Sequence, residues 1–574
     1  MGLLVDGLII VFYFVVITAI GLRMGRREES LHDFALGGRR VPWWAVMASI
    51  IAAETSAATF LGAPGEGYDK QSLAYVQLVF GVIIGRFVVG NIFLKPYYQY
   101  KVYTVYDYLG VRFGPKTKNY VSGLFLVMRT LASGTRLFVP SLVMVLAWRM
   151  FAGRQQVQFS QQAVTGVGPY LVAIIALTII TCIYTALGGI KAVIWTDVIQ
   201  ACLMFGGALV AAITLLIHIG GFEAVGRAVP QMTHLQGYFI TGFEPDLVTK
   251  WQADNHVQGM NLWQYIKLIL ASDYTVFSAL IGTSLGNMAA FGTDQDMVQR
   301  MLTAETHQKA RRSLLTAAFM DLPIATVFTF IGILLFVFYQ QDPTFKPAAN
   351  SDVFGSYILN VMPIGIRGLV LAGVFATAMG SLSAALNALA TSATNDWYLP
   401  RVPGRSEAHY VRAARAFTTV FAILMVGIAG GFAYAKVTNP DIRIIPVVLG
   451  IAGFILGPML GVFLLGMFTK DRGSDRGNII ALTLGLIATV VLGDLHITIL
   501  NGIAPLLGHH TPFVRPDWLP KVSFTWFAMI GAIVVLAVGM LFQTPPEILD
   551  AAERQAAEAD REEARPLAQR EVMG

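Results

Sequence analysis

Residues 43–68 read WWAVMASIIAAETSAATFLGAPGEGY, an apolar stretch of membrane-spanning length that polar residues and a helix-loosening Gly-Ala-Pro-Gly segment interrupt. The interruption begins at Glu54 and continues through Thr55 and Ser56. A carboxylate in the middle of a membrane helix is costly in lipid, and broken backbone is tolerated there only where it lines a polar cavity. In a membrane protein this combination indicates an ion and substrate site.

The composition around this stretch is that of a membrane protein. The chain has 574 residues, of which 55% are hydrophobic and 13% charged, with a mean hydropathy of +0.62. Soluble proteins carry about 25% charged residues. Apolar runs of about 20 residues, long enough to span hydrocarbon, recur from end to end. We therefore expect an all-α polytopic protein of the cell membrane, in contact with the lipid bilayer. The net charge of +6 comes from the loops and does not indicate a nucleic-acid partner.

The apolar runs predict thirteen membrane spans. Two of them, 118–151 and 354–396, exceed one bilayer crossing and are expected to tilt or to include short interfacial helices. The predicted spans are 3–24, 42–68, 72–97, 118–151, 168–187, 190–218, 268–294, 311–340, 354–396, 410–435, 444–469, 478–498 and 523–543.

The distribution of basic residues predicts the orientation of the chain. With the N-terminus outside and the C-terminus inside, the inner loops collect most of the Arg and Lys residues, and the outer loops hold far fewer. Such an excess of basic residues is typical of cytoplasmic loops. Residues 1–544 are then the membrane domain, and residues 545–574 form a short charged cytoplasmic tail.

Two of the predicted spans are interrupted by residues that break helices. The span at 42–68 is one, and the span at 268–294 is the other, where Gly282, Gly286, Asn287 and Gly292 interrupt the apolar run. Five spans begin with each of them. This pattern favours two inverted repeats, at about 42–218 and 268–469, with a binding site between them near the midplane of the membrane.

Six ionisable residues lie inside predicted spans, and each costs about 2.5–3.5 kcal/mol if it faces lipid. They are Glu54, Arg86, Arg129, Arg136, Asp197 and Asp321. For Arg86 and Arg129 the favoured interpretation is an ion pair that holds the helices together. Arg136 lies in SGTRLFVPSL, and facing a cavity its planar guanidinium would hold a substrate carboxylate by two parallel hydrogen bonds. An ion pair with Glu54, Asp197 or Asp321 is the alternative for Arg136.

The ninth span carries hydroxyl residues at helical spacing among Ala and Gly, in FATAMGSLSAALNALATSATNDWY. Small residues allow close packing of membrane helices. Hydroxyl and carbonyl oxygens are also what a dehydrated sodium ion requires, because it is a hard cation. Both interpretations stay open on composition alone.

The chain resembles the sodium/solute symporter family, which includes sodium–glucose, sodium–proline and sodium–sialic acid transporters. The resemblance extends from about Ala35 to Phe468. It rests on several linked stretches in order: FALGGRRVPWWAVMASIIAAETSAATFLGAPG, VYDYLGVRFG, YTALGGIKAVIWTDVIQ, FGTDQDMVQRML, the FATAMGS…NDWY helix and GPMLGVFLLGMF. It implies a leucine-transporter-like fold of five-plus-five inverted repeats and alternating access driven by a sodium gradient.

The same resemblance implies sodium as the coupling ion, bound between the first broken helix and the ninth span. The backbone carbonyls of Ala52 and Thr55 and the backbone of Thr377 would bind the ion, with Ser381 as a side-chain ligand. The family typically has two adjacent hydroxyl residues where this chain has Gly380 and Ser381, so one ligand is missing. Water or the Glu54 carboxylate could replace it, and proton coupling becomes conceivable. A second sodium site would use Asp197 and Ser383.

The solute pocket implied by the family separates its subgroups. Galactose-binding members use a Gln, Glu, Tyr and Lys at positions that here hold Thr59, Leu78, Ala290 and Asp321, so a plain hexose is disfavoured. Sialic-acid members are more similar. They hold the solute with residues at positions similar to those of Ser56, Thr59, Gln77, Arg136 and Asn287. Placing Gln77 requires one gap, placing Arg136 requires a four-residue shift, and Glu54 stands where those members have a neutral polar residue.

We therefore predict a sodium-coupled symporter of a small polar organic solute that works as a monomeric unit. A carboxylate-bearing solute such as sialic acid or another sugar acid is the leading candidate, and a neutral sugar, a monocarboxylate or a vitamin is the alternative. A transporter-like nutrient sensor would need a signalling domain, which the tail does not offer. A gated channel would need a continuous polar stripe. An enzyme is disfavoured because no helix shows a metal-binding His pair or a nucleophile with its base. Roles for Glu54 and Asp321 in coupling stay open.

Overall fold

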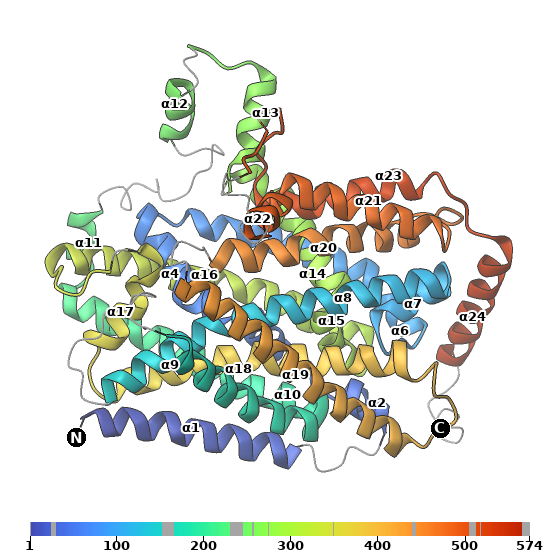
Figure 1. The fold of residues 1–574 in the computed structure, drawn as a ribbon, viewed down its shortest axis with the longest axis horizontal. Helices are drawn as coiled ribbons and strands as arrows, with labels where there is room; N and C mark the ends of the chain where they lie inside the picture. Colours follow the sequence, from blue (N-terminus) through green and yellow to red (C-terminus); the bar gives the residue numbers. More distant parts are fainter. Residues whose placement is uncertain are drawn as a thin grey trace.

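Helices run side by side along most of the length of the molecule (Figure 1). The computed structural model describes residues 2–24, 30–151, 166–229, 245–254, 258–273, 275–347, 349–438, 444–503, 513–516 and 518–564. Within these ranges the regular structure is helical apart from two isolated β-bridges. This confirms the predicted all-α class.

The longer helices form the body of the molecule. They are α1 (Gly2–Met24), α3 (Trp43–Glu54), α4 (Ala57–Lys70), α5 (Leu78–Val88), α8 (Pro115–Arg136), α9 (Phe138–Phe151), α10 (Gly168–Ile219), α14 (Ser284–Thr293), α16 (His307–Gln341), α18 (Ile366–Ser392), α19 (Glu407–Thr438), α20 (Ile444–Phe468), α21 (Gly477–Leu492), α23 (Phe527–Gly539) and α24 (Pro546–Ala564).

Short helices connect or flank them. They are α2 (Leu31–Leu36), α6 (Leu94–Gln99), α7 (Val105–Arg112), α11 (Phe222–Ala228), α12 (Pro245–Asp254), α13 (Leu262–Ala271), α15 (Gln295–Leu302), α17 (Val353–Asn360) and α22 (Leu495–Ile503). Three π-helical turns, η3 (Val89–Phe93), η5 (Ser278–Thr283) and η7 (Ala393–Tyr398), and four 3₁₀ turns, η1 (Gly37–Arg39), η2 (Ala74–Gln77), η6 (Asn350–Asp352) and η9 (Phe524–Trp526), complete the described elements.

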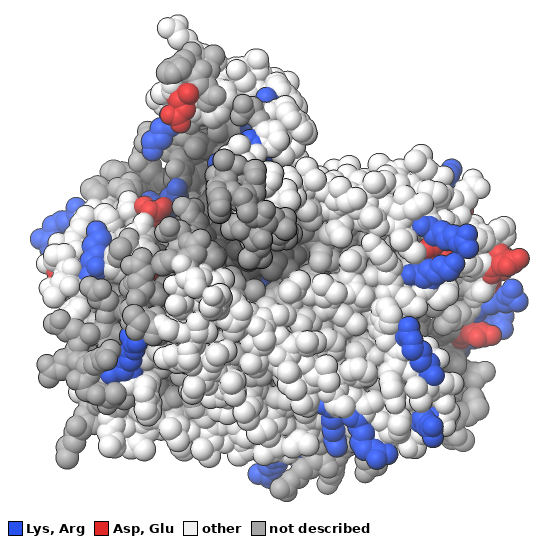
Figure 2. All heavy atoms as spheres, in the orientation of Figure 1, with Lys and Arg blue, Asp and Glu red and all other residues white. Residues whose placement is uncertain are grey.

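Seven helical stretches of the described residues are long and apolar enough to cross a membrane, and eight are if the bent pair α3 and α4 is counted as one span. The outer helices turn apolar side chains outward at helical spacing. On α1, for example, Leu4, Leu8, Phe12 and Val15 are all more than half exposed. A helix surface of this kind is compatible with lipid. The visible face is almost free of charge in its middle, and its Lys and Arg side chains lie mostly toward the ends of the molecule (Figure 2).

Helix α10 contains two of the predicted spans. It has 52 residues, which at about 1.5 Å per residue is about two and a half times the thickness of the hydrocarbon layer. The element bends at Gly189, whose backbone has φ 50° and ψ −152°. This conformation is accessible essentially to glycine alone. The bend falls between the predicted spans 168–187 and 190–218.

Helix α18 lies at the centre of the bundle. Nearly all its residues from Val370 to Ser392 are buried, whereas α1 and α19 expose most of their surface. Small residues on α18 let neighbouring helices approach closely. The ninth predicted span is therefore a core helix of the bundle.

The predicted interruption of residues 42–68 is present. Helix α3 ends at Glu54, and the stretch from Thr59 to Lys70 is inclined to α3 by 65°. Thr55 and Ser56 between the two helices have extended backbone, and the Ser56 hydroxyl caps α4 by accepting a hydrogen bond from the backbone N–H of Thr59. A serine at this position is a typical N-cap.

The second interruption lies later in the chain than the predicted glycines. Gly286 and Asn287 are inside α14, and Gly282 is in the π-helical turn η5. The backbone becomes extended at Asp294, whose side chain accepts a hydrogen bond from the backbone N–H of Asp296 and caps α15. The break occurs there because aspartate stabilises a helix start, while glycine and asparagine are tolerated inside a well-packed helix.

Candidate functional site

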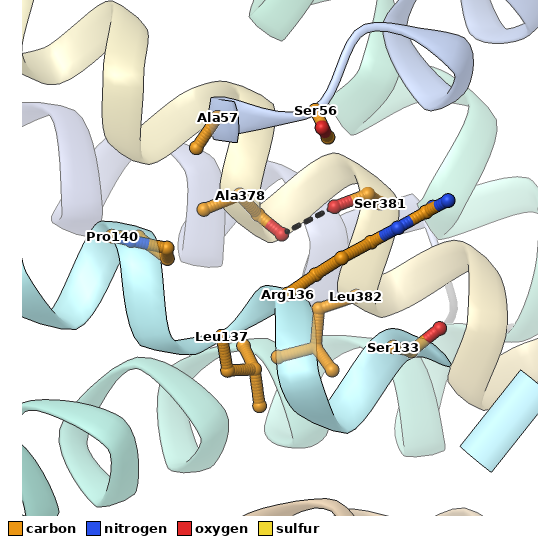
Figure 3. Close-up of a pocket in the computed structure, with 9 residues that line it drawn as sticks. All are labelled: Ser56, Ala57, Ser133, Arg136, Leu137, Pro140, Ala378, Ser381 and Leu382. Carbon is orange, nitrogen blue, oxygen red and sulfur yellow. Dashed lines mark hydrogen bonds between the residues drawn. The ribbon is translucent and has the colours of Figure 1, made fainter. Parts of the chain in front are cut away.

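A cavity of about 290 Å³, including its opening, lies where α4, α8, α9 and α18 meet. Its lining combines three serine hydroxyls and one guanidinium with small and apolar residues. The lining residues are Ser56, Ala57, Ser133, Arg136, Leu137, Pro140, Ala378, Ser381 and Leu382. Figure 3 shows the Arg136 side chain extending alongside Ser381 and away from Pro140.

Arg136 differs from the other arginines of the bundle. Arg86 contacts Glu54 and Asp321, and Arg129 contacts Asp294 and Asp296. Among the described residues no ion pair involves Arg136, although its side chain is partly buried and lines the cavity. A guanidinium in a low-dielectric site that no carboxylate contacts directly can bind an anion. The alternative ion pairs with Glu54, Asp197 or Asp321 are not formed in the described structure.

The hydroxyls beside Arg136 belong to the two elements that the family resemblance implicates. Ser56 Oγ lies 3.2 Å from Thr59 Oγ1, so Thr59 adjoins the cavity through the cap of α4. Ser381 Oγ donates to the carbonyl of Ala378 at 3.1 Å and leaves its lone pairs to the cavity. The structure thus brings together Ser56, Thr59, Arg136 and Ser381.

Gln77 and Asn287 lie elsewhere. Gln77 ends η2 and is buried, and its Nε2 has no hydrogen-bond partner within the described part of the chain. Asn287 donates to the carbonyl of Thr283 at 3.2 Å and packs against Gly85 of α5. Neither residue lines the cavity around Arg136.

Glu54 and Asp321 share one guanidinium. Arg86 donates to Glu54, and its Nη2 lies 3.0 Å from Asp321 Oδ2. Arg86 is fully buried and also lies over the Phe291 ring, 4.0 Å from its centroid. The Glu54 carboxylate is therefore directed to α5 and α16. This contact gives it a structural partner outside the cavity.

The residues predicted for the main sodium site gather at the joint of α3 and α18. Ala52, Thr55 and Thr377 are all buried. Thr377 Oγ1 donates to the carbonyl of Val374 at 2.7 Å. The Ala52 carbonyl oxygen faces Gly380 of α18. The contact between α3 and α18 thus includes a backbone carbonyl, and hydroxyl residues lie on both sides of it; oxygen atoms of these two kinds are what a hard cation prefers.

Asp197 is the anionic group nearest this joint. Its Oδ2 accepts a hydrogen bond of 2.6 Å from Ser49, and Arg300 Nη2 lies 3.5 Å from the same oxygen. Ser383, the other residue predicted for a second sodium site, donates to the carbonyl of Gly380 at 3.1 Å. Gly380 thus lies between the two predicted sodium sites.

A buried chain of charges connects this aspartate to the second broken helix. Arg300 also donates to Asp296 Oδ1 at 2.8 Å, Asp296 Oδ2 lies 3.1 Å from Arg129, and Arg129 donates to Asp294. The stretch FGTDQDMVQRML contributes to the family resemblance, but the resemblance assigns no role to Asp294, Asp296 or Arg300. Their charge within a buried segment was the signal that could have identified them.

The model of the sodium:solute symporter family matches residues 34–485. A sodium/sialic acid symporter of Proteus mirabilis is 28% identical over 490 residues, covering 83% of this chain and 86% of the relative. A sodium-dependent multivitamin transporter of Oryctolagus cuniculus is 26% identical, covering 94% and 82%.

Solved structures of symporters are also similar to this chain. A sodium-coupled sialic acid symporter, solved in a substrate-bound outward-open state with a novel sodium site, superimposes with a TM-score of 0.71 at 25% identity, covering 94% of this chain and 97% of that one. A nucleobase-cation symporter shares the fold, with a TM-score of 0.51 at 13% identity, covering 91% and 98%.

The chain belongs to the sodium:solute symporter family. It is a multi-pass membrane protein with a leucine-transporter-like fold, a sodium-coupled symporter and not an enzyme. Sodium and a solute are its partners.

Proposed function

We propose that this symporter imports a carboxylate-bearing solute such as sialic acid or another sugar acid, and that Arg136 binds the carboxylate. The observation that carries the proposal is the Arg136 guanidinium, which lines the cavity without an ion pair among the described residues. Ser56, Thr59 and Ser381 supply hydroxyls beside it. Such a guanidinium binds an anionic ligand more strongly than a neutral one.

Relatives support this choice and define its competitor. Two of them are named sodium/sialic acid symporters. Others are named for glucose and myo-inositol, which are neutral. A neutral solute would leave Arg136 buried and unpaired, which is costly. The guanidinium therefore favours an acid over a neutral sugar.

Sodium couples to this solute through the joint of α3 and α18. In our proposal Ala52, Thr55, Thr377 and Ser381 bind the main ion, and Asp197 with Ser383 holds a second. Ser381 also lines the solute cavity, so both ligands depend on the placement of α18. Sodium then favours the outward-open state that binds solute, and the two affinities rise together. Release of sodium to the inside lets the solute follow.

We also propose that residues 1–544 form the transporter domain as a monomeric unit in the lipid bilayer, with inverted repeats at about 42–218 and 268–469. The N-terminus is outside, and residues 545–574 lie in the cytoplasm. Helix α1 begins at one end of the molecule and α24 lies at the other, which supports opposite sides for the two (Figure 1). A cysteine introduced into α24, with Cys182 and Cys202 replaced, should react with an impermeant reagent only in inverted vesicles. Reaction in intact cells would reverse the orientation.

Thermal-shift measurements on the purified protein test the solute class. The probes are sialic acid, its methyl ester, lactate, biotin, glucose and myo-inositol, each in sodium chloride and in choline chloride. We expect stabilisation by sialic acid that requires sodium and is lost in the methyl ester, because the ester has no charge for Arg136. Equal stabilisation by the ester, or stabilisation by neutral sugars alone, would contradict an acid as the solute.

A further inference from the structure

Ser133 brings a third serine hydroxyl to the cavity, beside those of Ser56 and Ser381. It lies on α8, one turn before Arg136, and only 6% of its surface is exposed. Residues three positions apart are neighbours on one face of a helix. Ser133 and Arg136 therefore reach the cavity as adjacent side chains of the same helix.

Among the five serine and threonine residues of α8, Ser133 is the exception in its hydrogen bonding. Thr117, Ser122, Thr130 and Thr135 each donate to a carbonyl or a carboxylate. The Ser133 hydroxyl has no hydrogen-bond partner within the described part of the chain. A serine inside a helix ordinarily bonds back to the preceding turn, and a buried hydroxyl without a partner is costly and rare. This hydroxyl is therefore free to bind a ligand in the cavity.

The three serines lie on two sides of the Arg136 side chain (Figure 3). Ser56 and Ser381 lie on one side of it and Ser133 on the other, and the Ser133 hydroxyl is directed the same way as the guanidinium. Ser56 and Ser381 each make a hydrogen bond within the protein, whereas Ser133 does not make one with any described residue. A carboxylate held by Arg136 thus has two serines on one side, and Ser133 faces the solute from the other.

The rest of the cavity lining has no side chain that can form a hydrogen bond. It consists of Ala57, Leu137, Pro140, Ala378 and Leu382. A polar group of the solute that lies beside the carboxylate therefore has few side-chain partners in this cavity. On the side of the guanidinium away from Ser56 and Ser381, the Ser133 hydroxyl is the partner that the lining offers.

The position of Ser133 indicates which part of the solute it contacts. One turn separates it from Arg136, a rise of about 4.5 Å along the helix axis. The first atom of an acid beyond its carboxylate is carbon C2, so a substituent on C2 is the group nearest to the anchored end. A hydroxyl both donates and accepts hydrogen bonds, and Ser133 therefore matches either a hydroxyl or an oxo group on C2. Sialic acid and other sugar acids carry such an oxygen, whereas plain aliphatic acids do not.

We propose that Ser133 is a specificity-determining residue of this symporter, whose hydroxyl binds the oxygen on C2 of a 2-hydroxy or 2-oxo acid while Arg136 binds its carboxylate. The assignment rests on the proposed import of an acid and narrows that class to acids with an oxygen on C2. An acid without this oxygen would leave the Ser133 hydroxyl buried and unpaired. A site built to hydrogen bond an oxygen of its substrate rejects the analogue that lacks it.

Two pairs of acids that differ in the oxygen on C2 test this assignment. They are sialic acid with its 2-deoxy analogue, and lactate with propionate, each added to the purified full chain in sodium chloride and in choline chloride. The measurement is the apparent affinity obtained from thermal stabilisation. We expect wild type to bind the oxygen-bearing member about tenfold more tightly, as for one hydrogen bond in a buried site.

Variants of Ser133 show whether the preference comes from its hydroxyl. Ser133→Ala should bind both members of a pair equally, and Ser133→Thr, which keeps a hydroxyl, should keep the preference. The control is Ser141→Ala, which removes a fully buried hydroxyl that donates to the Phe138 carbonyl and does not line the cavity. It should match wild type. A general loss of stability affects both members of a pair alike, so a merely structural role of Ser133 would leave the ratio of the two affinities unchanged.

The outcomes separate this assignment from the proposed function. If no acid of either pair stabilises the protein in sodium, the import of such acids fails and the assignment fails with it. If acids bind but wild type does not distinguish the members of a pair, or if Ser133→Ala keeps the full preference, only the role of Ser133 is overturned. Should Ser133→Ala not fold, Ser133→Cys decides, because a thiol of similar size is a much weaker hydrogen-bonding group. An undiminished preference in Ser133→Cys would contradict the assignment.

Discussion

Arg86 donates a hydrogen bond to the carboxylate of Glu54, the last residue of α3 before the helix breaks. A carboxylate at a helix C-terminus faces the negative end of the helix dipole. Arg86 compensates both this repulsion and the burial of Asp321, which it also contacts. The conspicuous carboxylate of the broken helix therefore joins α3 to α5 and α16.

Removing Arg86 should destabilise the protein strongly. Arg86→Met leaves two carboxylates facing each other without a cation, and we expect a loss of about 3–5 kcal/mol in the free energy of unfolding. Chemical unfolding in mixed micelles measures this loss. The control is Lys309→Met, which removes an exposed ion pair with Glu305 and should cost less than about 1 kcal/mol. Equal effects of the two substitutions would show that the Arg86 contacts contribute no special stability.

Replacing Glu54 tests whether its carboxylate binds sodium. Because it pairs with Arg86, Glu54→Gln should leave the half-saturating sodium concentration for uptake within about twofold of wild type. A rise of about tenfold in this concentration would show that the Glu54 carboxylate binds sodium in place of the missing hydroxyl. Uptake at graded sodium concentrations distinguishes these results.

The bend of α10 should depend on the absence of a side chain at Gly189. Gly189→Ala places a Cβ on a backbone with φ 50°, and we expect a cost of about 1–3 kcal/mol. Gly206 of the same helix is the matched control, since a Cβ there meets nothing within 4 Å. Gly206→Ala should be neutral or stabilising by up to about 1 kcal/mol. Melting temperatures in detergent compare the two, and a neutral Gly189→Ala would mean that the bend tolerates a side chain.

Replacing Ser381 should weaken the binding of sodium more than the binding of the solute. Its hydroxyl lines the cavity beside Arg136 and is also predicted to bind the main sodium ion. Ser381→Ala should raise the half-saturating sodium concentration by roughly tenfold, as expected for the loss of one contact to a charged group. Uptake is measured while sodium and solute are varied independently. If only the apparent solute affinity changes, Ser381 belongs to the solute site alone.

Removing Arg300 should destabilise the protein strongly, because Arg300 belongs to the buried chain of charges that connects Asp197 to Asp294. It donates to Ser49 and Asp296 and lies 3.5 Å from Asp197. Arg300→Met strands two buried carboxylates, so we expect a loss of about 3–5 kcal/mol in unfolding free energy. Arg300→Lys keeps the charge without the planar fork and should lie in between. A fully stable Arg300→Met variant would contradict a role of this network in stability.

The sequence predicted those features that depend on local chemistry. Polar residues inside an apolar run located the first break at Glu54, and the pairing of Arg86 and Arg129 followed from the cost of buried charge. The second break was expected near Gly282–Gly292 but lies at Asp294. Its signal was present, because an aspartate followed by helix-forming residues is a typical helix start.

Features that depend on the packing of distant helices could not be predicted in this way. Spacing along the chain does not indicate that Gln200 of α10 and Ala52 of α3 converge on Gly380. Family resemblance placed Gln77 and Asn287 in the solute pocket, whereas the cavity around Arg136 is lined by other residues. Which side chains share a cavity depends on how each helix is rotated about its axis. The helical period shows which residues lie on one face of a helix, but it does not show which other helix packs against that face.

The most direct test of the account is uptake of radiolabelled sialic acid into proteoliposomes under an inward sodium gradient, for wild type, Arg136→Ala, Arg136→Lys and the exposed control Arg401→Ala. Truncating a buried partner of an anion costs about 2–5 kcal/mol. We therefore predict that Arg136→Ala abolishes uptake while sodium still stabilises the purified protein, that Arg136→Lys retains a part, and that Arg401→Ala matches wild type. Unchanged uptake by Arg136→Ala would contradict the central claim that this guanidinium binds the solute.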